Sequence, residues 1–187
     1  MTIRRLAVLA VACMSVACAV SNPFAQDPAP EPASKPLTDG NIVAIILAAN
    51  NTDLSYARLA PSRARSDAVK AFAQRMTTDH TILNNRVNEI AQKNGIVAED
   101  HVISLDFRDR SAARRDILRE LEGQKFDSTY AENEIAYHTE LAAAISGALL
   151  PGVHNAELRE FIIQVKPAVD GHLHHAEQMK AAVAARK

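Results

Sequence analysis

Three histidines continue apolar stripes in positions where a helical bundle normally buries hydrocarbon. They are His80, His138 and His172, on three different predicted helices, and each follows its apolar neighbours at a spacing of three or four residues. That spacing marks one face of a helix, and in a bundle this face is buried. Because burying an ionisable group is costly unless it finds partners, we expect these histidines to form a ligand set or a hydrogen-bonded core network.

Two carboxylates share these inner faces. Asp53 lies in the stripe of the first predicted helix, and Glu134 lies one turn before His138, so that Glu134 and His138 could both touch one ion. Imidazole and carboxylate are the usual ligands for zinc, iron and manganese, and bundle cores are where di-iron proteins build their sites. One interpretation is therefore a module that binds a divalent metal through Asp53, His80, Glu134, His138 and His172.

The same residues also fit a metal-free interpretation. A buried histidine often donates to a carbonyl or a tyrosine hydroxyl, and partners are available because Tyr130 lies one turn from Glu134 and Asp79 adjoins His80. The alternative is a structural or envelope-stress protein whose core histidines form a buried hydrogen-bond network. A di-iron oxidase is disfavoured, because the Glu-x-x-His pattern is absent and only one glutamate lies convincingly on an inner face.

Helix geometry sets the expected depth of each group. Reflecting the first hairpin about its tight turn leaves Asp53 roughly 10 Å from His80 along the bundle axis. Across the second turn, His172 lies level with Glu134, and His138 lies about one turn away. We therefore expect a site built from Glu134, His172 and one other histidine, rather than one compact site that uses all five groups.

Helical patterns account for the chain after its N-terminal segment, and no segment is a convincing strand. The caps expected from residue type are Ser66, then Asp127 or Ser128, as N-caps, with Asn94-Gly95 as a C-terminal stop. The expected helices span residues 41–60, 66–93, 105–122, 127–149 and 155 to the C-terminus.

The connections between these helices indicate their arrangement. The tight turns at 61–65 and 150–154 make two antiparallel hairpins, and the segment 94–126 is long enough to cross from one end of the bundle to the other. Two hairpins joined by one long crossover is the ferritin-like arrangement. We therefore expect residues 40–187 to form an all-α, ferritin-like four-helix bundle with an extra helix in the crossover.

The first 25 residues have the pattern of an export signal, in which Arg4 and Arg5 precede an apolar run too short to span a bilayer as a retained helix. Two processing routes remain open. An ordinary signal peptidase could cut near Ala19 or after Ala25, or Cys18 could be acylated as the first residue of a lipoprotein. We expect a protein exported to the periplasm or outer membrane of a Gram-negative bacterium, with Cys18 as the membrane anchor in the lipoprotein case.

The tether, the cysteine positions and the net charge exclude several classes of function. Residues 26–39 are rich in Pro and Ala and should form an extended tether. The two cysteines, Cys13 and Cys18, lie in or beside the signal, so the mature domain has no disulfide and no thiolate site. Loss of Arg4 and Arg5 shifts the net charge from −1 to about −3, which gives no case for a nucleic-acid partner. The sequence does not indicate an oligomeric state.

Several separated motifs match one known family in order and spacing. They are Val69–Met76 followed by Asp79-His80, then Phe126-Asp127, Tyr130, Glu134–His138, Pro167 and His172. Over residues 40–183 the chain resembles the exported bacterial proteins grouped as domain of unknown function 4142, often labelled outer membrane proteins. The resemblance implies a ferritin-like fold and a signal peptide or lipobox. It implies no activity, because none is established for the family.

The chain departs from the family pattern at the candidate site. Asp53 and Ser55 stand where the family commonly has glutamates on the first helix, and Glu134 stands where it commonly has glutamine ahead of the histidine. The first difference shortens the reach of the carboxylate, and the second adds a charge. A metal site is therefore not carried over from the family residue by residue.

Overall fold

The computed structural model describes residues 36–185, and over this range the chain is all-α, as predicted. Within it there is no strand, and Ala64 and Gly123 form one isolated bridge. The predicted signal segment, Cys18 and most of the tether lie outside the described residues. The elements are α1 (Asp39–Ala57), α2 (Ala60–Arg63), α3 (Asp67–Lys93), α4 (Val102–Arg119), α5 (Gly123–Ala144), the π-helical turn η1 (Ile145–Leu149), α6 (Leu150–Gly152) and α7 (Ala156–Ala184).

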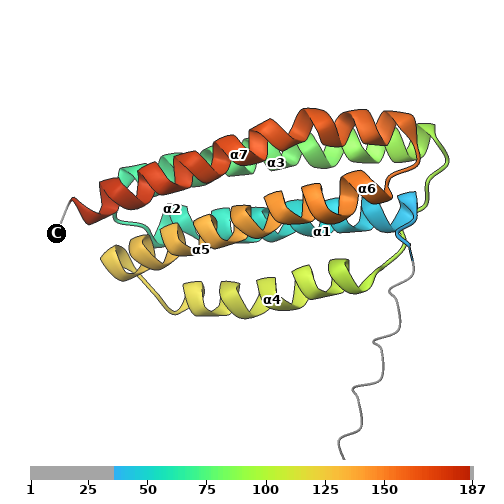
Figure 1. Ribbon diagram of the computed structural model, residues 1–187. Helices are drawn as coiled ribbons and strands as arrows, with labels where there is room; N and C mark the ends of the chain where they lie inside the picture. Colours follow the sequence, from blue (N-terminus) through green and yellow to red (C-terminus); the bar gives the residue numbers. More distant parts are fainter. Residues whose placement is uncertain (1–35, 186–187) are drawn as a thin grey trace, which may run out of the picture. The chain divides into compact units, whose positions relative to one another are not determined.

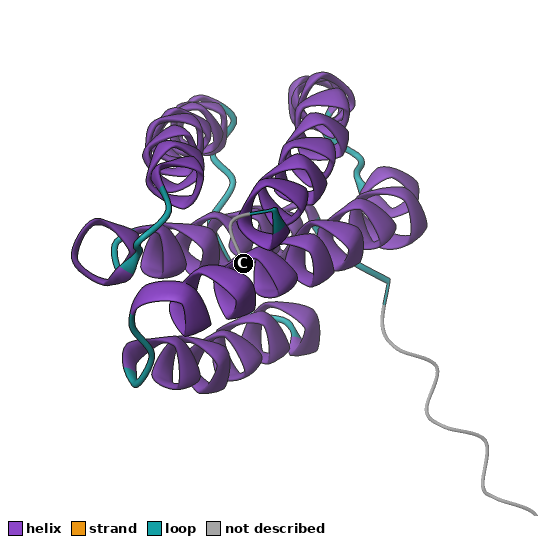
Figure 2. Ribbon diagram, turned by 90° about the vertical axis from the view of Figure 1, so that its left-hand side faces the viewer, coloured by secondary structure: helices purple, strands orange, loops and turns teal. Residues whose placement is uncertain are grey.

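Four long helices form a bundle, and α4 packs against its side (Figure 1). Helices α1 and α3 pair as one antiparallel hairpin, and α5 and α7 pair as the other. Between the hairpins, α4 lies along α1 and returns the chain to the end of the bundle where α5 begins. Figure 2, which looks toward one end of the bundle, shows helices and connecting loops alone in the described part. The predicted two-hairpin connectivity with a helical crossover is confirmed, and it is consistent with a ferritin-like arrangement.

The faces predicted to be apolar are the buried faces of the long helices. Each large apolar side chain that is fully buried contributes roughly 1.5–3 kcal/mol, and twelve of them lie in the predicted stripes of α3, α5 and α7. They are Val69, Phe72, Met76, Val87 and Ile90 in α3, Tyr130 and Leu141 in α5, and Leu158, Phe161, Val169, Met179 and Val183 in α7. No helix in residues 36–185 has the length and apolar character that a membrane span requires.

Carboxylates from the opposite hairpin hold the starts of α3 and α7. The oxygens of Asp127 accept hydrogen bonds from the backbone N–H groups of Arg65 (3.1 Å) and Ser66 (2.9 Å) at the start of α3. Asp39, at the start of α1, accepts from the N–H groups of His154 (2.8 Å) and Asn155 (3.0 Å) ahead of α7. Each hairpin therefore supplies a carboxylate that fixes the axial position of the other.

This arrangement corrects one prediction about helix ends. Asp127 does not cap its own helix, because α5 begins at Gly123 and Asp127 lies within its first two turns. Ser66 occupies the N-cap position of α3 as predicted, but its side chain makes no capping hydrogen bond. The buried carboxylate of Asp127 instead holds the backbone just ahead of the helix, at Arg65 and Ser66, from across the bundle. Asn155 is the N-cap of α7, where its side-chain oxygen accepts from the N–H of Leu158 at 3.0 Å.

A close approach between α1 and the connector after α3 depends on glycine. A Cβ atom at Gly40 would overlap the carbonyl oxygen of Val97. Beside it, the backbone N–H of Glu99 donates to the Gly40 carbonyl at 3.1 Å, and the Asn41 side chain donates to the Glu99 carbonyl at 3.1 Å. These contacts attach the first part of the crossover to the start of the bundle.

We predict that Asp127→Ala lowers the free energy of unfolding by about 1–3 kcal/mol, because two N–H groups at the start of α3 lose their acceptor. The measurement is urea denaturation of the purified domain followed by circular dichroism. The control is Asp67→Ala, which removes an exposed carboxylate from the first turn of the same helix. Equal losses of stability in the two variants would contradict the role assigned to Asp127.

Candidate functional site

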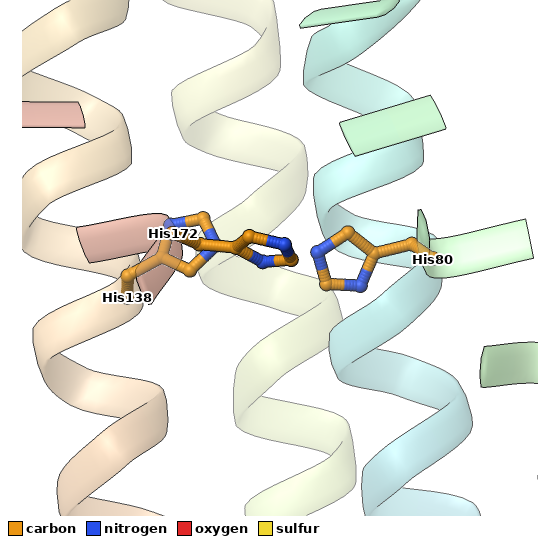
Figure 3. A group of neighbouring side chains, drawn as sticks. All are labelled: His80, His138 and His172. Atoms are coloured by element: carbon orange, nitrogen blue, oxygen red, sulfur yellow. The ribbon is translucent and has the colours of Figure 1, made fainter. Parts of the chain in front are cut away.

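The five residues singled out from the sequence lie together at the centre of the bundle. Their side chains come from all four long helices, and each residue is at least 98% buried. Figure 3 shows the three imidazoles directed toward one another from separate helices. They are Asp53 in α1, His80 in α3, Glu134 and His138 in α5, and His172 in α7.

The three imidazoles are close enough to share one ion. Ring centroids lie 5.4 Å apart for His80 and His172, 5.4 Å for His138 and His172, and 6.1 Å for His80 and His138. One nitrogen of each ring lies within 4.8 Å of one nitrogen of each of the other two. Ligands about 2.0–2.2 Å from a metal ion lie at most about 4.4 Å apart, so a small inward movement of the rings would complete a three-histidine set.

One nitrogen of each ring is fixed by a hydrogen bond to a protein oxygen. His80 Nδ1 lies 2.9 Å from Asn50 Oδ1, and His138 Nδ1 lies 3.0 Å from the backbone carbonyl oxygen of Glu134, one turn earlier. His172 Nε2 lies 2.9 Å from Asp79 Oδ2. Because these oxygens accept, each of the three nitrogens carries the proton.

The opposite nitrogens are buried and have no hydrogen-bond partner in the described structure. They are His80 Nε2, His138 Nε2 and His172 Nδ1. Each is the nitrogen left with a lone pair when the other nitrogen of its ring donates. In the neutral form of each ring, the outer hydrogen bond therefore leaves the second, buried nitrogen unprotonated.

Asp53 lies between two of the rings. Its Oδ2 is 2.8 Å from His80 Nε2 and 3.4 Å from His138 Nε2, and neither contact has the alignment of a hydrogen bond. Glu134 Oε2 lies 3.5 Å from His138 Nδ1. Asp53, Glu134 and His138 form a second group that could hold a metal ion, with one atom of each within 4.8 Å of the others. The two groups share His138.

Burial and mutual charge act differently on the two carboxyl groups. Burial alone would raise the pKa of Asp53, but attraction by the protonated forms of His80 and of the other two imidazoles outweighs it and lowers that pKa below its usual value. For Glu134, burial and the repulsion of Asp53 raise the pKa well above its usual range. The structure therefore favours an ionised Asp53 beside a protonated Glu134.

Burial also favours the neutral form of two imidazoles, those of His138 and His172. It lowers the pKa of His138 to about 4, although Asp53 opposes the shift, and it lowers the pKa of His172. Two aromatic rings contribute to the apolar surroundings of His138, because Phe72 and Tyr137 pack edge-to-face against it. His138 is thus a neutral imidazole at pH 7, which is the form that binds metal ions.

The predicted depth of Asp53 was wrong. The sequence placed it roughly 10 Å from His80 along the axis, whereas the two side chains are 2.8 Å apart. Helix α1 ends at Ala57, and the connection to α3 includes the short helix α2 before α3 begins at Asp67. This connection is longer than the turn assumed at 61–65, so it shifts α3 along the axis and brings His80 level with Asp53.

The expected grouping of Glu134 with His172 is also not the one observed. Glu134 groups with Asp53 and His138, and His172 groups with His80 and His138. His138 is the residue common to both groups, and the sequence had placed it about one turn away from the other two. Glu134, His138 and His172 all lie on the second hairpin, and the first hairpin completes the two groups with Asp53 and His80.

Sequence reasoning missed two residues that orient the imidazoles. Asn50 is three residues before Asp53 on the inner face of α1, and this spacing could have indicated it. The sequence suggests Asp79 as a partner of its neighbour His80, yet Asp79 accepts from His172 across the bundle. Adjacent residues of a helix point in different directions, so Asp79 faces α7 while His80 faces the core.

We predict that the stability of the metal-free protein depends on pH through Glu134. Unfolded glutamate ionises above about pH 4.3, whereas the folded pKa is raised well above this, so the folded state binds more protons and stability falls as pH rises. Glu134→Gln should therefore gain stability relative to wild type from pH 5 to pH 7, by at most about 1.4 kcal/mol per pH unit.

The measurement is urea denaturation at pH 5, 6 and 7 in the presence of a chelator. Glu132→Gln is the matched control, because this glutamate lies on the same helix and is exposed. A constant difference between Glu134→Gln and wild type at all three pH values would contradict a buried, protonated Glu134.

Comparison with known proteins gives one match. The profile of the family described as "Domain of unknown function (DUF4142)" matches residues 23–179. Searches of curated proteins and of solved structures found no significant match. The matched range contains all five clustered residues as well as Asn50 and Asp79, and it covers most of the chain. The protein therefore belongs to the DUF4142 family.

Proposed function

We propose that this domain binds one divalent transition-metal ion (zinc, iron or manganese) at the centre of its bundle. The proposed ligands are His80, His138 and His172, with Asp53 as a fourth. Glu134 lies beside His138 as an additional carboxylate. Imidazole and carboxylate are suitable donors for all three metals.

The observation that carries this proposal is the direction of the outer hydrogen bonds. Metal-binding histidines almost always donate their second ring nitrogen to a carboxylate, a carbonyl or water, which fixes the tautomer and turns the free nitrogen toward the ion. His172 has this bond to Asp79, His138 to a backbone carbonyl, and His80 to Asn50. All three free nitrogens are buried in the same cluster.

Electrostatics supports a cation at this position. Asp53 Oδ2 and the free nitrogen of His80 are 2.8 Å apart, and when Nδ1 of that ring carries the only proton, both atoms are acceptors. Two acceptors at this distance repel each other unless a proton or a metal ion interacts with both. A divalent ion would also favour ionisation of Glu134, because a nearby cation lowers the pKa of a carboxyl group.

The second candidate function is a metal-free structural domain with a buried hydrogen-bond network. The observation that favours it is that one nitrogen of every histidine in the cluster already has a protein acceptor. In this case His138→Gln would lower stability by a few kcal/mol or less, and metal ions would have no effect on the melting temperature.

The test of the metal proposal is titration of the chelator-treated protein with Zn²⁺, Fe²⁺ and Mn²⁺ under anaerobic conditions, followed by calorimetry and thermal melting. We expect one equivalent of at least one ion to bind. At a free concentration 100 times Kd, that ion should stabilise the fold by about 2.7 kcal/mol. Elemental analysis of the untagged protein should find the same ion.

Two variants separate the cluster from surface histidines. We expect His172→Gln to lose tight binding, and we expect the control His154→Gln, at an exposed position, to retain it. Asp79→Ala removes the acceptor of His172, together with an ion pair to Arg75 at the surface, and should weaken binding about 10- to 100-fold. Absence of bound metal together with an unchanged melting temperature would favour the structural network instead.

We also propose that the chain is exported and acts in the periplasm or at the outer membrane. The support is its N-terminal pattern, in which Arg4 and Arg5 precede a short apolar run and residues 26–39 suit a tether. Under the lipoprotein route Cys18 would anchor the domain to a membrane, and otherwise the domain would be released after cleavage.

Mass spectrometry of the protein from fractionated Gram-negative cells tests this proposal. We expect a chain that begins at acylated Cys18 or at an unmodified residue between Ala19 and Gln26. Cys18→Ser should release the domain from the membrane only in the first case. Recovery of a full-length chain with Met1 in the cytoplasm would contradict export.

A further inference from the structure

A small apolar cavity lies inside the bundle, on one side of the histidine cluster. Its volume is about 30 Å³, and its walls come from α1, α3, α7 and the last turns of α5 with η1. Ten of its lining residues are apolar, and Asn50 and His80 are the polar ones. The cavity therefore ends at the histidine whose free nitrogen faces Asp53.

The π-helical turn is part of this wall. Ile145 and Leu149, the first and last residues of η1, both line the cavity, and both are buried. A π-helical turn is rare and is frequently found at functional sites. On other helices, Ile46, Leu83 and Val165 line the cavity and are only half-buried, which places one side of it near the surface.

The chemistry of the walls selects the occupant. A buried water needs about two to four polar partners. Here the nearest are His80, whose Nδ1 is already bonded to Asn50, and the Nδ2 group of Asn50, which has no partner among residues 36–185. Ions are excluded more strongly, because the apolar walls offer no counter-charge. The volume suits a molecule of two or three heavy atoms.

We infer that this cavity binds a small, neutral, apolar gas molecule, namely dioxygen, and holds it beside His80. Binding to the cavity depends only on its size and its apolar walls. A chemical use for the bound gas rests on the proposed function, because only a redox-active metal ion at His80 (iron or manganese, and not zinc) would make dioxygen reactive there. The experiment is therefore done on metal-free protein, so that failure of the metal proposal does not affect its result.

Dioxygen is paramagnetic, so its position can be found by NMR. The experiment records methyl relaxation rates of the metal-free protein, labelled at Ile, Leu and Val methyl groups, under several bar of dioxygen and under the same pressure of nitrogen. We expect the enhancement at Ile145 and Leu149 to be at least about threefold larger than at Leu118, which is equally buried in α4 and lies outside the cavity lining.

Val165→Phe provides the matched test, because the larger ring is placed at the half-buried side of the cavity. We expect it to reduce the enhancement at Ile145 and Leu149 to the value at Leu118. The control Ile163→Phe adds a ring at an exposed position of the same helix and should leave the enhancement unchanged. Equal enhancement at Ile145 and Leu118 in the wild-type protein would overturn the inference, as would an unchanged pattern in a folded Val165→Phe variant.

Discussion

The carboxylate of Asp53, fully buried between two imidazoles, is the interaction on which the rest of the bundle depends. An isolated charge in a protein interior costs many kcal/mol unless it is compensated. Compensation for Asp53 requires a proton or a cation shared with the nearest nitrogens of His80 on α3 and His138 on α5, which lie 2.8 and 3.4 Å from its Oδ2. Asp53 on α1 must therefore lie at the same depth along the bundle axis as His80 on α3 and His138 on α5. A shift of α3 by one turn would leave the carboxylate without its nearest imidazole. The polar cluster thus specifies the register of a core that is otherwise apolar.

Hydrogen bonds at the two ends of the bundle also fix the axial positions of the helices. Asp127 holds the start of α3, and Asp39 holds the start of α7. Because each carboxylate belongs to the opposite hairpin, these four backbone hydrogen bonds fix how far one hairpin can slide along the other. The histidines of α3 and α7 then meet at the centre, where α1 and α5 supply Asp53, Glu134 and His138. The end contacts and the central cluster therefore support one another.

The sequence predicts positions within one helix better than it predicts the relative depth of two helices. The stripes of α3, α5 and α7 repeat with the helical period, so the burial of His80, His138 and His172 could be predicted from spacing alone. The relative depth of Asp53 and His80 could not, because it depends on how far the chain travels between Ala57 and Asp67, and no periodic pattern encodes that distance. Asp79 was missed for a related reason, since its partner His172 is 93 positions away.

A surplus of acceptors distinguishes the two interpretations of the cluster. A metal-free network is stable when each buried acceptor faces a donor. Here the free nitrogens of His138 and His172 and both oxygens of Asp53 face one another without a donor aligned to any of them. Extra protons are a poor remedy at neutral pH, because burial lowers the pKa of His138 to about 4 and also lowers that of His172. Glu134, with its raised pKa, can donate one proton, and within residues 36–185 the buried Nδ2 of Asn50 and the hydroxyl of Tyr130 are donors without a partner. A divalent cation would interact favourably with all of these lone pairs at once, and this is the physical argument for the proposed metal centre.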